Sequence, residues 1–161
     1  KREVKPQVGL SQQTISAKND WDRMDWTVEV MNVSDNSYNG KKLTELDLSA
    51  FVKLRKIKVG NECFKNVKKV NICGLKELES VYVGNKSFRR DGDSKGGSFS
   101  LKSCPKLKSL KMGRYSFSDY SVCQIENVDA LEVIEMGDLD YWSGCFYWSS
   151  LELKSILSLS E

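Results

Sequence analysis

The side chains able to do chemistry are few in kind. The 161-residue chain has no histidine, which excludes imidazole general bases, Ser-His and Cys-His nucleophile pairs and His-containing zinc sites. Its five cysteines are odd in number and include no C-x-x-C pair, so they indicate neither a metal knuckle nor a complete disulfide framework. We expect them to pack as small buried apolar residues. No constellation of acid, base and nucleophile is present, so the sequence predicts no enzyme, no cofactor and no metal site.

Two sequons and one acidic loop are the remaining candidates for site chemistry. Asn32 and Asn85 each begin an N-x-S sequon, and as candidate glycosylation sites they favour a secreted or cell-surface location without fixing the compartment. Asp91 and Asp93 are too few ligands to hold a calcium ion by themselves. No stretch approaches the roughly 18 to 20 apolar residues of a membrane-spanning helix. The chain begins with Lys1, so we expect it to be a processed or excised piece of a longer protein.

The elements that must position any site are indicated by two recurring phrases. The long phrase reads apolar, two residues, apolar, one residue, apolar, Gly, and its four copies lie 24, 29 and 24 residues apart. These copies are residues 54–60, 78–84, 107–113 and 131–137. The short phrase, apolar-x-apolar, begins at Leu46, Val70, Phe99, Cys123 and Leu151. Self-similarity at such spacing is the signature of a repeat architecture.

The spacing between the two phrases is constant on one side only. The second apolar residue of the long phrase follows the first residue of the short phrase by 11 residues in all four complete copies. The distance from there to the first residue of the next short phrase varies, at 13, 18, 13 and 17 residues. Insertions are therefore confined to one corner, as in the polar, Gly-rich stretch 89–97. A fixed side opposite a tolerant side is typical of a solenoid, because stacked strands must stay in register.

Each apolar-x-apolar triplet has the alternation of a β-strand, with its outer residues facing inward. We therefore expect a repeat solenoid, mainly β, with two short parallel strands per coil of about 24 residues, two parallel sheets and little helix. The glycine that ends the long phrase suits a sharp turn or a positive φ. A small residue and an aromatic follow it in each copy, which predicts a stacked Phe column in the core: Cys63-Phe64, Ser87-Phe88, Ser116-Phe117 and Cys145-Phe146.

The predicted solenoid spans residues 43–161, with about four coils and an incomplete last coil that begins at Leu151. Residues 1–42 are less regular, and we expect them to form a divergent N-terminal coil or cap. Within them, 26–30 fits a strand of the short-phrase kind. Ile15, Trp21 and Met24 are candidates for a cap over the first coil.

The run 104–113, Cys-Pro-Lys-Leu-Lys-Ser-Leu-Lys-Met-Gly, followed by Ser116-Phe117, resembles the BspA-like branch of the leucine-rich-repeat proteins. That branch shows C-x-x-L-x-x-I-x-I followed by a turn and a small-aromatic pair, and the likeness covers about residues 43 to 159. The chain departs from the branch in using Gly where Pro usually follows the strand, and in having the additional apolar-x-apolar strand. The resemblance implies a protein-interaction or cell-surface adhesion role without catalytic residues.

The outward positions of the predicted strands are the natural surface for a ligand. On the long-phrase strands the candidate binding residues are Arg55, Lys56, Lys58, Tyr82, Lys108, Lys111, Glu132 and Glu135. The middle residues of the short phrases form a polar column of Asp47, Asn71, Ser100, Gln124 and Glu152. A solvated face is the alternative interpretation of both. Five aromatics crowd the last insertion and are either interface anchors or part of a hydrophobic cap: Tyr141, Trp142, Phe146, Tyr147 and Trp148.

Charge is distributed unevenly along the chain, although the net charge is only +3. Residues 41–118 hold 19 basic and 7 acidic side chains, whereas residues 119–161 hold 1 basic and 9 acidic. An acidic C-terminal end is therefore able to dock on a basic part of another copy. Nucleic acid is not expected as a partner, because the lysines lack interleaved stacking aromatics and the acidic end compensates them.

These observations predict a non-catalytic leucine-rich-repeat module for protein–protein recognition or adhesion, with other proteins as partners. The alternative is a structural subunit that self-assembles head-to-tail into filaments through its basic middle and acidic C-terminal end.

Overall fold

The computed structural model describes residues 9–16, 23–89, 96–137 and 143–155. These segments contain eleven short β-strands and no helix, and therefore no helix long and apolar enough to cross a membrane. The strands are β1 (Gln12–Ile15), β2 (Val30–Val33), β3 (Glu45–Asp47), β4 (Lys56–Val59), β5 (Lys69–Cys73), β6 (Ser80–Val83), β7 (Gly97–Lys102), β8 (Ser109–Met112), β9 (Tyr120–Glu126), β10 (Val133–Met136) and β11 (Ser150–Lys154).

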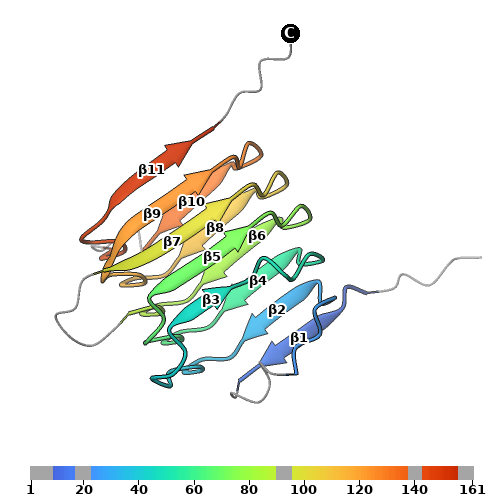
Figure 1. The fold of residues 1–161 in the computed structure, drawn as a ribbon, viewed down its shortest axis with the longest axis horizontal. Coiled ribbons are helices and arrows are strands. Elements are labelled where there is room, and N and C mark those ends of the chain that lie inside the picture. Colours follow the sequence, from blue (N-terminus) through green and yellow to red (C-terminus); the bar gives the residue numbers. More distant parts are fainter. Residues whose placement is uncertain (1–8, 17–22, 90–95, 138–142, 156–161) are drawn as a thin grey trace, which may run out of the picture.

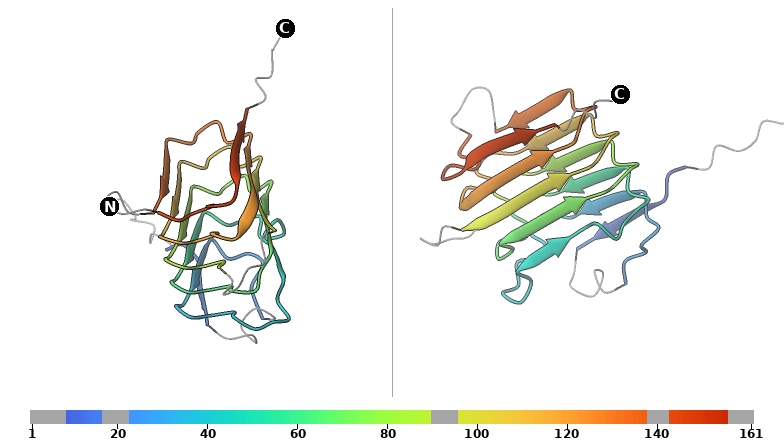
Figure 2. Two further views of the ribbon diagram at one scale, coloured as in Figure 1. Left: turned by 90° about the vertical axis from the view of Figure 1, so that its left-hand side faces the viewer. Right: turned by 45° about the horizontal axis from the view of Figure 1, so that its top comes forward.

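The strands form two parallel sheets that face each other (Figures 1 and 2). The six-stranded sheet has the order β1-β2-β4-β6-β8-β10, and the five-stranded sheet has the order β11-β9-β7-β5-β3. From β2 onward, consecutive strands alternate between the sheets, so each parallel connection passes through a strand of the opposite sheet instead of the usual helix. We call one strand of the five-stranded sheet with the strand that follows it a coil. The prediction of a mainly β chain with two parallel sheets is confirmed.

The two sequence phrases are hydrogen-bonded neighbours in these sheets. The second apolar residue of the long phrase aligns across four strands of the six-stranded sheet: Ile57, Val81, Leu110 and Ile134. The first residue of the short phrase aligns across the five-stranded sheet: Leu46, Val70, Phe99, Cys123 and Leu151. The constant 11-residue link therefore places equivalent residues of successive coils directly over one another.

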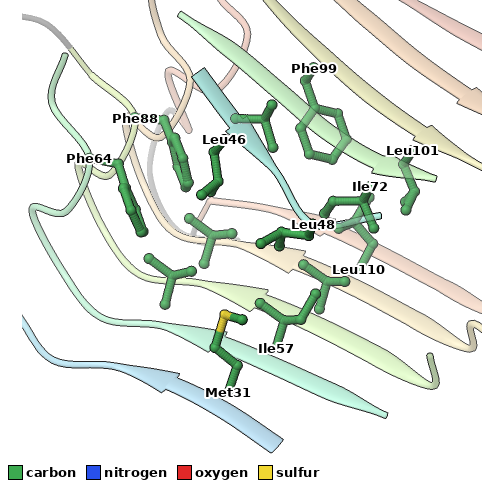
Figure 3. Close-up of a cluster of buried hydrophobic side chains, with 14 of the residues drawn as sticks. Met31, Leu46, Leu48, Ile57, Phe64, Ile72, Phe88, Phe99, Leu101 and Leu110 are labelled. Atoms are coloured by element: carbon green, nitrogen blue, oxygen red, sulfur yellow. The ribbon is translucent and has the colours of Figure 1, made fainter. Parts of the chain in front are cut away.

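The core lies between the two sheets and is filled from both. Buried residues alternate with exposed or half-buried ones along β4 and β6, as expected where only one face of a strand is covered. Figure 3 shows Leu48, directly after β3, and Ile72 of β5 opposite Ile57 and Leu110 of the six-stranded sheet. All four are 3% exposed or less. Burial of each contributes about 1.5–3 kcal/mol relative to exposure, which makes the space between the sheets the main source of stability.

An aromatic column runs through the corner that follows the six-stranded sheet (Figure 3 shows two of its rings). The successive ring centroids are 5.3, 4.9, 4.6 and 5.0 Å apart, and the rings are within 15° of parallel. The members are Tyr38, Phe64, Phe88, Phe117 and Phe146. All five have φ between +47° and +58°, a region that bulky residues rarely adopt. The predicted Phe column is confirmed, and its stacking holds the chain in an unfavourable turn.

The glycine of the long phrase is required for close approach of two coils. A Cβ on Gly84 would lie 2.5 Å from the carbonyl oxygen of Gly60 and 2.6 Å from its carbon. Of the two expected roles, a sharp turn or a positive φ, the positive φ is found among the long-phrase glycines only at Gly137, at +81°, whereas turns follow Gly60, Gly84 and Gly113 directly. Only glycine lets adjacent backbones pack this tightly.

The N-terminal region contributes strands to the six-stranded sheet. Met31 of β2 lies opposite Ile57 of β4, so residues 28–33 are a further copy of the long phrase. The prediction of a short-phrase strand at 26–30 is therefore wrong. Apolar residues alternate at 26, 28 and 30, but the strand itself continues the alternation at Met31 and Val33, which lie opposite Ile57 and Val59. A shift of one residue changes which side chains of a strand face the core.

The same region covers the N-terminal end of the core. Ile15 of β1 and Met24 are 0% and 5% exposed, and a cap formed by them stays a prediction. Trp26 lies in a turn, 58% exposed, with its ring stacked on Phe51 at 4.7 Å. Trp21 lies outside the described residues.

Candidate binding surfaces

The outer face of the six-stranded sheet brings the candidate binding residues of the long-phrase strands together. Lys58, Tyr82 and Lys111 are direct neighbours across β4, β6 and β8. Tyr82 is 45% exposed between the two cations. Lys56 and Lys58 are exposed along β4, and Lys108 is exposed at the entry to β8. We call Lys56, Lys58, Tyr82, Lys108 and Lys111 the basic face.

Opposite charges on successive coils pair across this sheet. Arg55 Nη2 lies 2.7 Å from Glu79 Oε1, and Arg55 Nε donates to the same oxygen at 3.2 Å. The hydrogen bond and charge of Glu79 raise the pKa of the Arg55 guanidinium. Lys111 Nζ lies 3.1 Å from Glu135 Oε1. These pairs are solvated and add little stability, but they occupy Arg55 and partly neutralise Lys111.

Three lysines of the basic face remain available to a partner. Within the described segments, Lys56, Lys58 and Lys108 form no ion pair with another side chain. Glu132 likewise forms none within these segments, although it lies next to Lys108 in the backbone ladder. The positive potential of the face therefore centres on β4 and the start of β8.

The polar column on the five-stranded sheet is in register as predicted, but its members bond to one another. Asn71 Nδ2 donates to Asp47 Oδ1 at 3.2 Å, and Gln124 Nε2 donates to Glu152 Oε2 at 3.3 Å. Hydrogen bonds from the side chain and backbone of Ser49 hold the pKa of Asp47 below its usual range. This face therefore offers fewer unsatisfied groups than the basic face.

The aromatic cluster predicted near the last insertion is divided by the structure. Phe146 is 7% exposed and belongs to the stacked column. Tyr147 and Trp148 are 51% and 53% exposed, with their rings edge to face at 4.7 Å. Tyr141 and Trp142 lie outside the described residues. Of the five aromatics in this cluster, the structure therefore places Tyr147 and Trp148 on the surface.

The C-terminal end of the core is not covered by any described residue. Leu151 and Leu153 of β11 align with Cys123 and Ile125 of β9, which are 1% and 0% exposed. Leu151 and Leu153 themselves are 49% and 56% exposed, at the outer edge of the five-stranded sheet (Figure 1). Beside them is an open hollow of about 580 Å³, lined by Ile125, Val128, Asp129, Leu153, Lys154 and Ser155.

Sequence reasoning identified a break in the pattern at this end but not the residues of the hollow. The sequence does contain a pattern that points to these residues. Ile125 ends a short phrase and Val128 follows it by three residues, as Leu75 follows Ile72. At the equivalent place in an earlier coil, Leu75 is fully buried. Val128 is only half-buried because no described strand lies over it.

The sequon at Asn85 coincides with a structural ladder in the turn after β6. The Asn85 N–H donates to Asn61 Oδ1 at 2.8 Å, and Asn85 Oδ1 accepts from the Arg114 N–H at 2.9 Å. Ser87 is buried and its hydroxyl donates to a backbone carbonyl of the preceding coil at 2.7 Å. The Asn and Ser of this sequon therefore both have a structural role in the turn, which accounts for their spacing without glycosylation. Asn32 is half-buried on the outer side of β2, and glycosylation of either residue stays a prediction.

All five cysteines are free thiols. Cys63, Cys104 and Cys123 are buried, whereas Cys73 and Cys145 are half-buried. Burial raises the pKa of Cys123 to about 12. The expected packing role is confirmed for the three buried thiols, and a raised pKa makes such thiols inert at neutral pH.

In the part of the chain that the structure describes, no group of three or more His, Cys, Asp or Glu residues could hold a metal ion. Asp91 and Asp93 lie outside that part. No protein-family model, no curated protein and no solved structure matches this chain. Its function must therefore be inferred from its own surfaces.

Proposed function

We propose that this chain is a non-catalytic solenoid of the leucine-rich-repeat type that recognises other proteins through its basic face. The observation that carries the proposal is the exposed Tyr82 held in register between Lys58 and Lys111. Hydrogen-bonded strands lie about 4.8 Å apart, so the three side chains are spaced by the backbone ladder. Because the ladder fixes the backbone beneath these side chains before binding, the backbone itself loses little conformational entropy when a partner binds.

The alignment of equivalent residues across both sheets supports the solenoid. Each complete coil places its long phrase over that of the coil before, and each short phrase likewise. The stacked aromatic column repeats at the same interval. A chain built in this way buries each coil against its neighbours and leaves the outer faces of the strands for recognition.

The form and charge of the basic face favour a protein partner with an acidic surface. The sheet surface is extended, whereas small-molecule sites are concave. Tyrosine is enriched among the residues that dominate protein interfaces. Lys56, Lys58 and Lys108 supply the positive charge that would attract and orient acidic side chains.

Affinity capture with matched variants tests the proposal. The full chain is immobilised beside a Lys58→Glu, Tyr82→Ala variant and a control variant, Lys69→Glu, Val122→Ala, which makes the same kind of change on exposed residues of the five-stranded sheet. Proteins bound by the wild type and by the control, but lost with the first variant, support the proposal. Proteins retained equally by both variants contradict it.

Self-assembly is the second candidate function. It is favoured by the half-exposed Leu151 and Leu153, which occupy core positions of β11. Exposed strand edges and apolar surface promote association between copies. Sedimentation of the chain at high concentration and low salt, with electron microscopy of the same sample, tests it. Filaments that disappear in a Leu153→Ser variant support self-assembly, and a monodisperse monomer contradicts it.

A further inference from the structure

Three successive strands of the six-stranded sheet, β4, β6 and β8, carry only hydrogen-bond donors on their outer face. Along each strand, buried residues alternate with exposed or half-buried ones, so the outward positions are fixed by the strand itself. The side chains at these positions end in an ammonium or a hydroxyl group, and none is a carboxylate. We call them the donor grid: Lys56, Lys58, Ser80, Tyr82, Ser109 and Lys111.

The register of the sheet arranges the donor grid in two rows. The first row is Lys56, Ser80 and Ser109, and the second row is Lys58, Tyr82 and Lys111. Neighbours within a row are about 4.8 Å apart, because they lie on adjacent strands. The two rows are about 6.6 Å apart, because they are separated by two residues along each strand. Each row therefore offers an ammonium and at least one hydroxyl group to an anion.

Carboxylates of the chain border the donor grid without entering it. Glu79 lies just before β6 and is bonded to Arg55 at 2.7 Å. Glu135 extends the second row onto β10, and its Oε1 lies 3.1 Å from Lys111 Nζ. The two lysines of β4 form no ion pair with a described side chain. A carboxylate from a partner would therefore share Lys111 with Glu135 but would not compete for the lysines of β4.

The outer face of the five-stranded sheet is less suited to an anion. Its carboxylates stand among the donors and are bonded to side chains of neighbouring strands. Glu126 lies 3.3 Å from Lys102, and Asp47 accepts a hydrogen bond from Asn71 at 3.2 Å. These carboxylates would repel acidic side chains of a partner. Of the two described sheet faces, the donor grid is thus the better complement to an acidic surface.

We propose that the donor grid binds an extended segment of a partner protein with the pattern acidic-x-acidic. Alternate side chains of an extended chain lie on one side and repeat every 6.6 to 6.8 Å or so, about the distance between the two rows. One carboxylate lies over Tyr82, between Lys58 and Lys111, and the other lies beside Lys56 in the first row. The inference rests on the proposed recognition of proteins through the basic face, and it names the pattern that this face recognises.

The hydroxyl groups and the flat surface favour an acidic peptide over single-stranded nucleic acid. Proteins that bind single strands combine a basic groove with aromatic side chains on which successive bases stack. The donor grid lies on a sheet and contains one aromatic, Tyr82. Its ammonium and hydroxyl groups donate to carboxylates, and hydrogen bonds to an ionised acceptor are about twice as strong as neutral ones.

Two peptides of equal composition and charge test the spacing. Thr-Glu-Thr-Glu-Thr places its acidic side chains on one side of an extended chain, whereas Thr-Thr-Glu-Glu-Thr places them on opposite sides. The amide resonances of the full 161-residue chain are followed by NMR as each peptide is added at low salt. The alternating peptide is expected to bind at least about fivefold more tightly, because only it brings both carboxylates to the sheet. The shifts are expected to concentrate on β4, β6 and β8.

Matched variants of the chain locate the site. Glu135→Gln removes the carboxylate that shares Lys111, so it is expected to tighten binding of the alternating peptide about threefold. Glu126→Gln frees Lys102 on the other sheet in the same way and leaves the affinity unchanged.

A second pair of variants removes one ammonium group from each face. Lys58→Gln is expected to weaken binding of the alternating peptide at least about fivefold, whereas Lys69→Gln on β5 does not weaken it. Both lysines are exposed, so their replacement leaves the core intact.

Three results would overturn the inference. They are equal affinity for the two peptides, equal tightening by Glu135→Gln and Glu126→Gln, and tighter binding of a thymidine oligonucleotide of equal charge to the donor grid. If capture of proteins depends on Lys58 and Tyr82 but the alternating peptide is not preferred, the acidic pattern is rejected and recognition through the basic face stands. If the alternating peptide is preferred but no captured protein depends on these two residues, the proposed function is rejected and the pattern stands.

Discussion

Replacing Gly84 with alanine is expected to separate two coils that pack backbone against backbone. The new Cβ would lie 2.5 Å from the carbonyl oxygen of Gly60, whereas ordinary van der Waals contact begins at 3.4 Å, so the coils would have to part by about 0.9 Å. Two hydrogen bonds cross this gap: Gly84 N–H to Val59 O at 2.9 Å, and Asn85 N–H to Asn61 Oδ1 at 2.8 Å. A parting of that size takes both beyond hydrogen-bonding distance.

The free energy of unfolding is expected to fall by about 3–5 kcal/mol. Each lost hydrogen bond costs about 1 kcal/mol net, and the remaining overpacking strain costs about 1–3 kcal/mol. For a chain of this size, about 2–4 °C of melting temperature is lost per kcal/mol, so the thermal midpoint falls by about 6–20 °C.

Urea denaturation followed by circular dichroism measures the effect, with two glycines as controls. A Cβ on Gly40 meets nothing within 4 Å, so Gly40→Ala changes stability by less than about 0.5 kcal/mol. Gly74 has equally open space but a φ of +70°, so Gly74→Ala costs about 1–2 kcal/mol from backbone strain alone. If Gly84→Ala is no worse than Gly74→Ala, close packing of the coils is not what this glycine permits.

Three further predictions follow from the core and the thiols. Phe88→Ala lowers the free energy of unfolding by about 3–5 kcal/mol. Phe88→Gly lowers it by about 1 kcal/mol less, because glycine adopts the φ of +55° without strain. Urea titration measures both variants, and an alanine variant that is more stable than the glycine variant contradicts this reasoning. Burial raises the pKa of the Cys63, Cys104, Cys123 and Cys145 thiols, so unfolded chains lose these protons first. The stabilising contribution of each thiol is complete below about pH 8.5 and falls above it, by up to about 1.4 kcal/mol per pH unit for each thiol, and for Cys123 this loss continues until the pH reaches its folded-state pKa of about 12. Urea unfolding under reducing conditions at successive pH values measures this slope, and Cys123→Ala reduces it; a slope unchanged by that variant is the contrary result. In the native chain, an alkylating reagent followed by peptide mass spectrometry labels Cys73 and Cys145 before Cys123, because only the former are half-buried.

The pairing of the strands from residue 43 onward could be predicted from the sequence because one spacing never varies. Eleven residues separate Leu46 from Ile57, and eleven separate Val70 from Val81. In the structure Leu46 is in register with Val70 in the five-stranded sheet, and Ile57 is in register with Val81 in the six-stranded sheet. Where the phrase lost its glycine, the prediction failed. Ser34 follows Val33 in place of glycine, so the copy at 28–33 went unrecognised and residues 26–30 were assigned to the wrong sheet.

The sequence predicted which side chains of the candidate surfaces point outward, and the structure showed which of them are paired and how exposed they are. Strand alternation places Lys58 and Tyr82 outward, which is a backbone property readable from sequence. The pairing of Arg55 with Glu79 was not readable, because it depends on side-chain geometry between residues 24 apart. The exposure of Leu153 was not readable either, since it depends on which strand lies above it.

The most direct test of protein recognition through the basic face is a comparison of dissociation constants for a captured partner. They are measured by isothermal titration calorimetry for the wild type, the Lys58→Glu, Tyr82→Ala variant and the Lys69→Glu, Val122→Ala control. Recognition through the basic face predicts a loss of about 30-fold or more in the first variant, because a buried tyrosine and a charge pair each contribute more than about 1 kcal/mol at an interface. It predicts an unchanged constant in the control. Equal constants for the wild type and the Lys58→Glu, Tyr82→Ala variant would contradict it.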